Sequence, residues 1–311
     1  MNAKKDFISI HDHSAAEIEE IFELAHEIKR SPATFRRELD GQTLAMIFEK
    51  SSTRTRVSFE AGMFQLGGHA LFLSSRDIQL GRGETIHDTA KVLSRYVDAI
   101  MARTFAHATV TDLAKYATIP VINGLTDLLH PCQAMTDYFT AGEKLGELRG
   151  RKLAWIGDGN NMANSLMFGA PKIGMNIAVA TPPGYEPDPG VVAKAKADAE
   201  AAGTRLVVTH SIEEAARDAD VVETDVWTSM GQEEESRKRI RDFQGWQVTP
   251  ELMALARKEA IFMHCLPAHR GEEVAAEVVD GPQSVIFDEA ENRLHVQKAI
   301  LVTLMKRSAS S

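Results

Sequence analysis

Short apolar runs alternate with helical patterns along the chain, and this alternation limits the possible folds more than any other feature. In the first half, the runs Thr43–Phe48, Ala99–Ala102 and Pro120–Ile122 are typical of buried strands. A second series follows: Leu153–Ile156, Ile177–Ala180, Leu206–Val208, Val221–Glu223, Ile261–His264 and Val285–Phe287. Strands that alternate with helices form parallel sheets covered by helices on both faces. We therefore predict an α/β fold of doubly wound parallel sheets.

Sequence signals at helix ends support this interpretation. Ser14 and Glu17 have the spacing of a capping box, which predicts a helix from Ala15 to Lys29. A second helical pattern, Val57–Leu66, is followed directly by two glycines. An alanine-rich helix is predicted to start near Pro189 and to end at a glycine, as helices often do.

The chain has 311 residues, enough for two domains. A polar, glycine-bearing stretch at 142–150 separates the two strand series, so we place the domains at 1–145 and 146–311 with a cleft between them. The last helix, about 294–306, is expected to cross back onto the first domain. Polar segments follow many of the predicted strands, and ligands of such folds bind beyond the carboxyl ends of strands.

Composition excludes several classes of protein. A net charge of -9 argues against nucleic acid or an anionic membrane as the main partner. The two cysteines, Cys132 and Cys265, suggest no disulfide framework. Residues Met1 to Ser14 contain no apolar stretch long enough to predict a signal peptide, and no apolar run reaches the roughly 18 residues of a membrane helix. We therefore expect a cytoplasmic globular protein.

A cluster of hydroxyl and arginine side chains lies between the first strand and the following helix. The segment Lys50-Ser-Ser-Thr-Arg-Thr-Arg56 places backbone N–H groups, hydroxyls and guanidinium groups at a helix N-terminus, where the helix dipole favours an anion. It lacks the glycines of a Walker A loop. The alternative is an ordinary Ser/Thr N-cap with solvated arginines, but the density of donors favours a phosphate site.

Further hydrogen-bond donors follow two other predicted strands. Arg103 comes directly after Ala99–Ala102, and His130 and Gln133 open the helix after Pro120–Ile122. Imidazole and amide groups can both donate to one carbonyl oxygen, and a guanidinium can add its charge. Together the three side chains would form an oxyanion-type site. Taken singly, each has a structural alternative, such as a surface ion pair for Arg103.

Gly157-Asp-Gly-Asn-Asn161 invites comparison with a dinucleotide-binding loop. The third glycine of that motif would fall at Met162, whose side chain would hold the helix away from the strand. The next strand runs into Thr181-Pro-Pro183 instead of the acidic residue that binds a ribose. Both departures argue strongly against the binding of a nicotinamide cofactor.

Each of three further features, Asp225, Cys265 and the segment Gln232–Arg241, has a structural as well as a functional interpretation. A carboxylate such as Asp225 suits a substrate with ammonium groups, although an N-capping aspartate is the alternative. No Cys-x-x-Cys spacing surrounds Cys265, so neither zinc nor redox chemistry is indicated there. Gln232–Arg241, rich in charges of both signs, is predicted to be a solvated helix.

These segments together resemble the aspartate/ornithine carbamoyltransferase family over nearly the whole chain. Five signatures occur in the family's order, each at the end of a predicted strand: Ser52-Thr-Arg-Thr-Arg56, His130-Pro-Cys-Gln133, Gly157-Asp-Gly-Asn-Asn161, Ser229-Met-Gly231 and His264-Cys-Leu-Pro267. One tetrapeptide would be a weak signal, whereas five in order are a strong one.

The resemblance implies roles for individual residues. The carbamoyl phosphate site would comprise Ser52, Thr53, Arg54, Thr55, Gln79, Arg103, His130, Gln133, Cys265, Leu266 and Arg293. The ornithine site would comprise Asn161, Asp225, Ser229 and Met230, and catalysis would depend on Arg103, His130, Gln133, Asp225 and Cys265. In the family, the loop that carries Gln79 reaches into the neighbouring subunit, which implies a homotrimer with shared active sites.

The expected reaction is the transfer of a carbamoyl group from carbamoyl phosphate to the δ-amine of ornithine, giving citrulline and phosphate in arginine metabolism. Because arginines supply the positive charge, we expect no metal and no cofactor. Ser229-Met-Gly231 favours ornithine over aspartate, putrescine or N-acetylornithine. Two alternatives from other classes are a dinucleotide oxidoreductase and a non-catalytic amino-acid-binding protein. The sequence does not indicate whether the reaction serves synthesis or breakdown.

Overall fold

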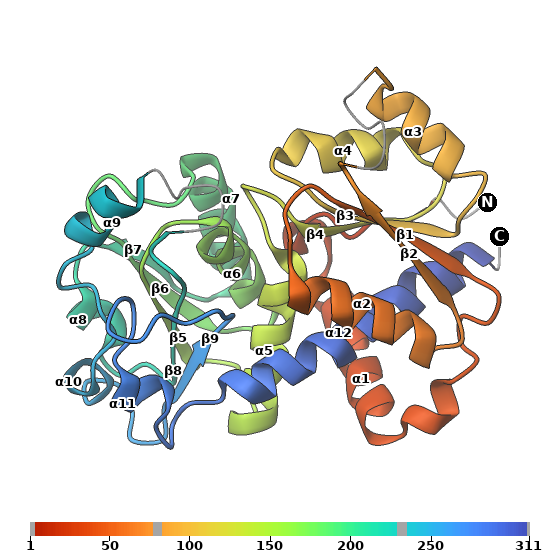
Figure 1. Ribbon diagram of the computed structural model, residues 1–311. Coiled ribbons are helices and arrows are strands. Elements are labelled where there is room, and N and C mark those ends of the chain that lie inside the picture. Colours follow the sequence, from red (N-terminus) through yellow and green to blue (C-terminus); the bar gives the residue numbers. More distant parts are fainter. Residues whose placement is uncertain (1–3, 77–82, 229–234, 310–311) are drawn as a thin grey trace. The chain divides into compact units, whose positions relative to one another are not determined.

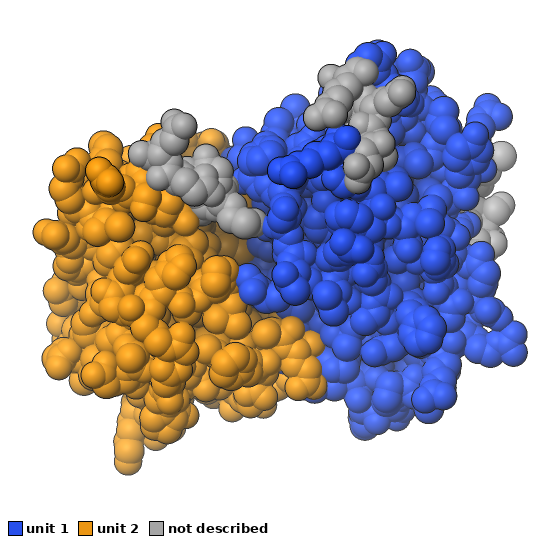
Figure 2. Space-filling model, in the orientation of Figure 1, with its two compact units in different colours: residues 1–135, 292–311 blue, residues 136–291 orange. Residues whose placement is uncertain are grey.

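The structure is a computed structural model that describes residues 4–76, 83–228 and 235–309. The chain forms two compact units (Figure 2): unit 1 consists of residues 1–135 and 292–311, and unit 2 of residues 136–291. In sequence, the first division falls inside one helix, α5 (Pro131–Leu145), and the second inside the last helix, α12 (Ile286–Ala309). The predicted boundary between residues 145 and 146 falls at the end of α5, ten residues after the division between residues 135 and 136.

Unit 1 is built on a four-stranded sheet in which every pair of neighbouring strands is parallel. The strands, in the spatial order β2-β1-β3-β4, are β1 (Thr43–Phe48), β2 (His69–Ser74), β3 (Ala99–Arg103) and β4 (Val121–Leu125). The α-helices of this unit, besides parts of α5 and α12, are α1 (Ala15–Arg30), α2 (Thr53–Gln65), α3 (Ile86–Leu93) and α4 (His107–Tyr116). Short 3₁₀ helices occupy Ile10–Asp12 and Pro32–Phe35.

Helices cover both faces of this sheet (Figure 1). On one face, α3 and α4 pack against alternate residues of the central strands and bury Ala45, Ile47, Ile100, Val110 and Leu113 completely. On the opposite face lie α1, α2 and the later part of α12. The buried strands read as continuous apolar runs because both of their faces are covered.

Unit 2 repeats this design with a five-stranded parallel sheet in the order β7-β6-β5-β8-β9. Its strands are β5 (Lys152–Ile156), β6 (Asn176–Ala180), β7 (Leu206–Thr209), β8 (Val221–Thr224) and β9 (Ile261–His264). Its remaining α-helices are α6 (Asn161–Lys172), α7 (Pro189–Ala202), α8 (Ile212–Ala216), α9 (Ser236–Asp242), α10 (Pro250–Met253) and α11 (Ala276–Val279). One face of the sheet packs against α8, α10 and α11 around Ile156, Val222 and Phe262.

The strand order reverses once in each sheet. In unit 1 the reversal lies between β1 and β3, and in unit 2 between β5 and β8. At such a point, the loops that follow the two central strands lead to opposite faces of the sheet, which leaves a crevice at their carboxyl ends. Two of the predicted polar segments follow β1 and β3, and two follow β5 and β8. The fold therefore places each pair of segments together.

The predicted class of two parallel-sheet α/β domains is confirmed, as are several details. Ser14 and Glu17 form the predicted capping box, with both reciprocal hydrogen bonds present. Helix α7 runs from Pro189 to Ala202, and the predicted glycine, Gly203, is its C-cap with a positive φ of 70°. Because glycine has no side chain, it adopts this left-handed conformation at little cost in free energy.

At two places the structure differs from the elements predicted from the sequence. Strand β2 was not predicted. Among the described strands it pairs only with β1, and its side chains are partly exposed, so its apolar signal is weak. Val285–Phe287 was predicted to be a strand, but α12 begins at Ile286, and only the neighbouring Ser284 forms an isolated bridge to Phe262. A short apolar run is compatible with a strand or with part of a buried helix, and here the run leads into a helix of 24 residues.

Candidate active site

The first group of predicted site residues lies at the start of α2 in unit 1. The helix begins at Thr53, not near Val57 as predicted, so Thr53, Arg54 and Thr55 form its first turn. Ser52 is the N-cap, and its hydroxyl accepts a hydrogen bond from the Thr55 N–H at 3.1 Å. The hydroxyls and Arg54 therefore surround the positive end of a helix dipole, which favours an anionic ligand.

Two predicted arginines converge on Thr55, and one of them also contacts Gln133. Arg293 donates from Nη2 to the Thr55 hydroxyl at 3.1 Å and from Nη1 to the Gln133 amide oxygen. Arg103, the last residue of β3, approaches the same hydroxyl at 3.5 Å from its Nη1. Arg103, Arg293 and Gln133 are all buried. Because the Thr55 oxygen accepts from guanidinium groups, its own hydrogen is left to donate to a ligand.

Further support for Arg293 comes from Gln297, one turn later on α12. In the orientation that satisfies its amide, Gln297 accepts from Arg293 Nη2 at 2.9 Å and from Nε at 3.2 Å. Such contacts hold a planar guanidinium in a fixed orientation, which is needed for paired hydrogen bonds to phosphate or carboxylate oxygens.

His130 lies beside these arginines and is buried at the start of α5. Burial is the main reason that the pKa of His130 lies well below its usual value of 6.5, and Arg293, Arg103 and Arg54 lower it further. The imidazole is therefore neutral near pH 7 and can donate one hydrogen bond to a carbonyl oxygen without adding charge. Cys132, in the same turn, has its pKa raised to about 12 by burial and is not a nucleophile.

A second group of predicted residues surrounds Asp225 in unit 2, directly after β8. The Asp225 carboxylate accepts from Asn160 Nδ2 at 3.1 Å, from the Cys265 thiol at 3.2 Å and from the Val226 N–H at 2.8 Å. Burial, followed by the negative charge of Asp225, raises the pKa of Cys265 well above 9.0. Cys265 is therefore a neutral thiol that donates a hydrogen bond to the Asp225 side chain, the acidic group at this site that suits a cationic ligand.

The loop after β5 presents asparagines to the same carboxylate. Asn160 caps α6 by accepting from the N–H groups of Met162 and Ala163, and its amide nitrogen reaches Asp225. Asn161, the predicted ligand, is the first residue of α6. The sequence-based prediction missed the role of Asn160, although an asparagine immediately before a helix is a recognisable N-cap signal.

Gly159 is required for this loop to take its course. A Cβ atom at this position would lie 2.2 Å from the backbone nitrogen of Pro187, far inside van der Waals contact. Because that neighbour is backbone and cannot swing aside, no larger residue fits.

Leu266 adopts a strained conformation beside the site. Its φ of 60° lies in the left-handed region, which is costly for a residue with a branched side chain. The Leu266 N–H donates to His264 Nδ1 at 2.8 Å, so the other ring nitrogen of His264 carries the proton and donates to Glu273 Oε1 at 3.1 Å. The His264 N–H is bonded to Glu289 at 2.9 Å. This buried network fixes the backbone on either side of Cys265.

One prediction about the surface is wrong in part. The described portion of Gln232–Arg241 includes Arg239, which is buried rather than solvated. Its Nη1 donates to Asp158 at 2.7 Å and to the Trp227 carbonyl at 3.0 Å. The ion pair joins α9 to the loop after β5, so a charge-rich segment contains one tertiary contact that its composition does not reveal.

Asp225, His264 and Cys265 each place a possible metal-ligand atom within 4.8 Å of the others. Both ring nitrogens of His264 are engaged in the contacts described above, and the Cys265 thiol donates to Asp225. A metal ion there would have to displace all of these interactions, so the donor set does not favour one.

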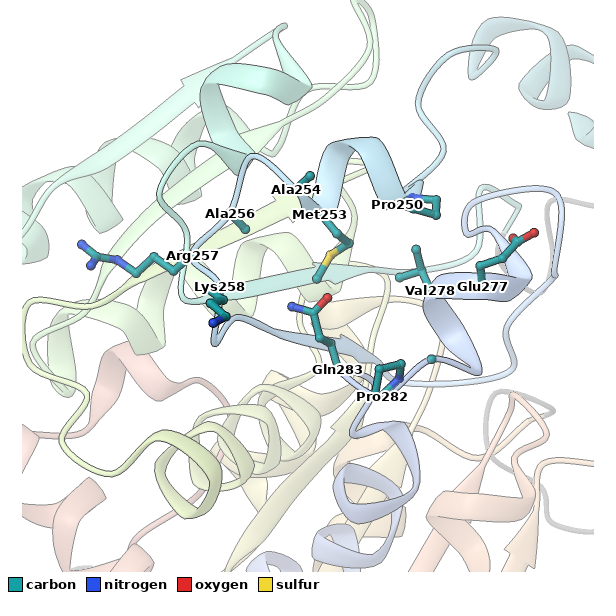
Figure 3. Close-up of a pocket in the computed structure, with 11 residues that line it drawn as sticks. Pro250, Met253, Ala254, Ala256, Arg257, Lys258, Glu277, Val278, Pro282 and Gln283 are labelled. Carbon is teal, nitrogen blue, oxygen red and sulfur yellow. The ribbon is translucent and has the colours of Figure 1, made fainter.

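A surface pocket of unit 2 lies at the opposite end of the sheet (Figure 3). Arg257 and Lys258 line it and precede β9, whose carboxyl end carries Cys265. The Arg257 side chain points away from the other lining residues and bonds the Asp218 carbonyl at 3.3 Å. The pocket therefore takes no part in the chemistry of either group of residues.

Among the described helices, none has the length and apolar character needed to cross a membrane.

The structure thus gathers the predicted residues into two groups. Unit 1 contains Ser52, Thr53, Arg54, Thr55, Arg103, His130, Gln133 and Arg293, and unit 2 contains Asn161, Asp225, Cys265 and Leu266. Gln79, Ser229 and Met230, which were also predicted to bind substrate, lie outside the described residues.

Comparison with known proteins identifies both units. Residues 5–143 match the carbamoyl-P binding domain of aspartate/ornithine carbamoyltransferases, and residues 149–304 match the Asp/Orn binding domain. The ornithine carbamoyltransferase of Carboxydothermus hydrogenoformans is 58% identical over 303 residues, covering 97% of each chain. The relative from Pyrococcus furiosus named "Ornithine carbamoyltransferase, anabolic" is 54% identical over 97% of each chain. A solved structure of ornithine carbamoyltransferase from P. furiosus has a TM-score of 0.94 with 98% of each chain covered.

Proposed function

Since the chain belongs to the aspartate/ornithine carbamoyltransferase family, we propose that it transfers the carbamoyl group of carbamoyl phosphate to the δ-amine of L-ornithine, releasing L-citrulline and phosphate. The observation that carries this proposal is that the candidate sites of the two units, each at the point where the strand order reverses, carry opposite charges. Arginines gather at the β1/β3 end of unit 1, whereas a carboxylate occupies the β5/β8 end of unit 2. Carbamoyl phosphate is an anion, and ornithine brings ammonium groups.

Unit 1 provides for the anion and for the carbonyl group. Ser52, Thr53, Arg54 and Thr55 at the N-terminus of α2 would bind the phosphate, assisted by Arg293. Arg103, the neutral His130 and Gln133 would direct hydrogen bonds at the carbonyl oxygen. Because these donors are buried and held in place, they stabilise negative charge on that oxygen without reorganising.

Unit 2 provides for the amine. The Asp225 carboxylate, with the Cys265 thiol beside it, attracts the δ-ammonium group, while Asn161 contributes to binding the amino-acid end. An alkyl ammonium has a pKa near 10.4, so the form that attacks is the neutral amine, whose first proton is released to solvent before the reaction. Placing the amine beside the carbonyl carbon converts a bimolecular step into an effectively unimolecular one.

In the reaction, the lone pair of the neutral δ-amine forms a bond to the carbonyl carbon, and the carbonyl π electrons move to oxygen. Collapse of this tetrahedral oxyanion restores the carbonyl and breaks the carbon–oxygen bond to phosphate, which leaves with the electron pair. The departing phosphate takes the remaining excess proton of the former amine. The arginines supply the positive charge that these steps require beside the carbonyl oxygen and beside the leaving phosphate oxygen.

An assay of purified protein with carbamoyl phosphate and ornithine, following citrulline, tests the proposal. Aspartate, putrescine and N-acetylornithine serve as parallel acceptors, and a chelator is present in one series. Turnover with ornithine alone supports it. Turnover with only another acceptor keeps the carbamoyl phosphate half and rejects ornithine, whereas no turnover from folded protein rejects the enzyme and favours an amino-acid-binding protein.

We further propose a homotrimer in a reducing, cytoplasmic setting that works toward arginine. Supporting the first point, β2 pairs with no described strand other than β1 and exposes Leu71 and Phe72. Cys132 and Cys265 form no disulfide. For the direction, a relative carries the word "anabolic" in its name. Light scattering would test the trimer, and growth of a complemented arginine auxotroph would test the direction.

A further inference from the structure

A second cluster of potential ligands lies in unit 2, in the turn His269–Glu273 between β9 and α11. One ring nitrogen of His269 and one carboxylate oxygen each of Glu272 and Glu273 lie within 4.8 Å of one another. From this cluster we propose a binding site for one divalent transition metal ion of the zinc type. The proposal is independent of the carbamoyl transfer reaction.

Backbone contacts hold the turn in shape. The Glu272 N–H donates to the His269 carbonyl at 3.0 Å, and the Gly271 N–H donates to the Val274 carbonyl at 2.9 Å. Gly271 has a φ of 88°, a conformation that a residue with a side chain adopts only with strain. The three side chains are therefore brought together by the fold and do not depend on the long reach of flexible side chains.

The distances in the cluster are those of a site open at its centre. His269 Nδ1 lies 3.9 Å from Glu272 Oε2 and 3.8 Å from Glu273 Oε2, both too long for hydrogen bonds. Ligands about 2.1 Å from a tetrahedral zinc ion lie about 3.4 Å apart, so small movements would complete three ligand positions. Water would occupy the fourth, because His269 and Glu272 are partly exposed.

Glu273 supplies the independent indication of a ligand. Its side chain is fully buried, and Oε1 accepts from His264 Nε2 at 3.1 Å and from the His269 N–H at 2.5 Å. The other oxygen, Oε2, is buried without a hydrogen-bond donor among the described residues and lies on the His269 side. A carboxylate oxygen withdrawn from water in this way needs a positive partner.

The alternative partner is a protonated His269 that only forms two long ion pairs. The ligand types distinguish the possible metals: an imidazole with two carboxylates suits zinc, cobalt or nickel, whereas calcium and magnesium prefer oxygen ligands throughout. A bound metal would clamp the turn that follows Leu266. It would also connect, through the Glu273–His264 hydrogen bond, to the segment that carries Cys265.

Calorimetric titration of the full chain, without a histidine tag, with zinc chloride tests the proposal. We expect one equivalent to bind, with affinity reduced at least tenfold in His269→Asn and in Glu272→Gln. Both residues are partly exposed, so these variants should fold, as circular dichroism would verify. His210→Asn is the matched control, because His210 is similarly exposed beside Glu186, and it should bind zinc like the wild type.

Cys265→Ala separates this site from the one around Asp225. Unchanged zinc affinity in Cys265→Ala supports the proposal, as does a cobalt(II) spectrum without thiolate charge transfer. Equal zinc affinity in the wild type and His269→Asn would overturn it, and so would loss of binding in Cys265→Ala. A wild type that binds no zinc would leave the ion-paired His269 as the explanation.

Discussion

The candidate sites of unit 1 and unit 2 occupy equivalent positions in their sheets but carry opposite charges. In each unit, loops that follow the two central strands of a parallel sheet meet where the strand order reverses, and one loop leads into a helix capped by Ser52 or Asn160. Unit 1 fills this position with arginines, and unit 2 with a carboxylate. The fold therefore decides where a ligand binds, and the side chains decide its charge.

The buried ionisable groups respond to this difference in opposite ways. In unit 1, burial together with three arginines lowers the pKa of His130 and keeps it neutral. In unit 2, burial together with carboxylates raises the pKa of Cys265 and of Glu223, which keeps both protonated. Each unit thus holds neutral donors beside the charge that binds its ligand.

The strongest test of the comparison removes positive charge from unit 1. Arg103→Ala should lower kcat by about 10²–10³, because a preorganised donor to the developing oxyanion is lost. Steady-state kinetics at saturating substrates measures the change. Arg103→Lys should recover part of the loss, and Arg95→Ala, an exposed arginine, should leave kcat unchanged. A decrease below tenfold for Arg103→Ala would remove this residue from the catalytic set.

The next test concerns Arg239, a buried cation in unit 2. Asp158→Asn removes the carboxylate that lies 2.7 Å from the buried Arg239 and leaves it the Trp227 carbonyl and the exposed Glu235 carboxylate at 3.5 Å, which should lower the free energy of unfolding by about 3 kcal/mol. Denaturant titration measures this loss. Asp242→Asn, which breaks the exposed pair with Lys238, should have a much smaller effect. Similar losses in both variants would contradict the structural role of Arg239.

Removing the carboxylate from unit 2 should affect one substrate selectively. Asp225→Asn should lower kcat/KM for ornithine by about 10–100-fold, since a charged hydrogen bond contributes about 1.5–3 kcal/mol. The KM for carbamoyl phosphate serves as the internal control and should change less than about twofold. An equal rise in both KM values would show that the charges do not divide the substrates between the units as proposed.

The smallest effect concerns the pH dependence of unit 2. Glu223 is fully buried on β8, and burial, followed by Asp137 and Glu289, raises its pKa well above 4.5. Above pH 4.5 the unfolded chain loses this proton while the folded chain keeps it. This contribution to stability is therefore complete below pH 4.5 and is lost as the pH rises toward the folded-state pKa.

Glu223→Gln should accordingly match the wild type near pH 4.5 and exceed it at pH 8, by about 1 kcal/mol or a few degrees in Tm. The glutamine amide can donate to Asp137 as the protonated carboxyl does. Thermal unfolding across this range measures the difference, with the exposed Glu277→Gln as control. A variant less stable than the wild type at pH 8 would mean that Glu223 is ionised in the folded protein.

Sequence patterns predicted the central strands of both sheets well because these strands are covered on both faces and read as unbroken apolar runs. They failed where cover is incomplete or ambiguous. Edge strand β2 is half-exposed, and the short apolar run at Val285–Phe287 continues into a long helix. Motifs indicated candidate ligand side chains for the same kind of reason, since dense polar groups directly after a buried strand are costly without a ligand to bind; their roles stay predictions.

The sequence by itself determined the fold class, the family and the chemical type of each predicted ligand group, because these follow from local periodicity and from short motifs. Only the tertiary structure decided which groups meet. Asn160 and Cys265 on Asp225, Arg293 on Thr55, and Arg239 on Asp158 join residues between 40 and 238 positions apart. Strand order and burial create such contacts and the pKa shifts that follow from them, and neither is encoded in a local pattern.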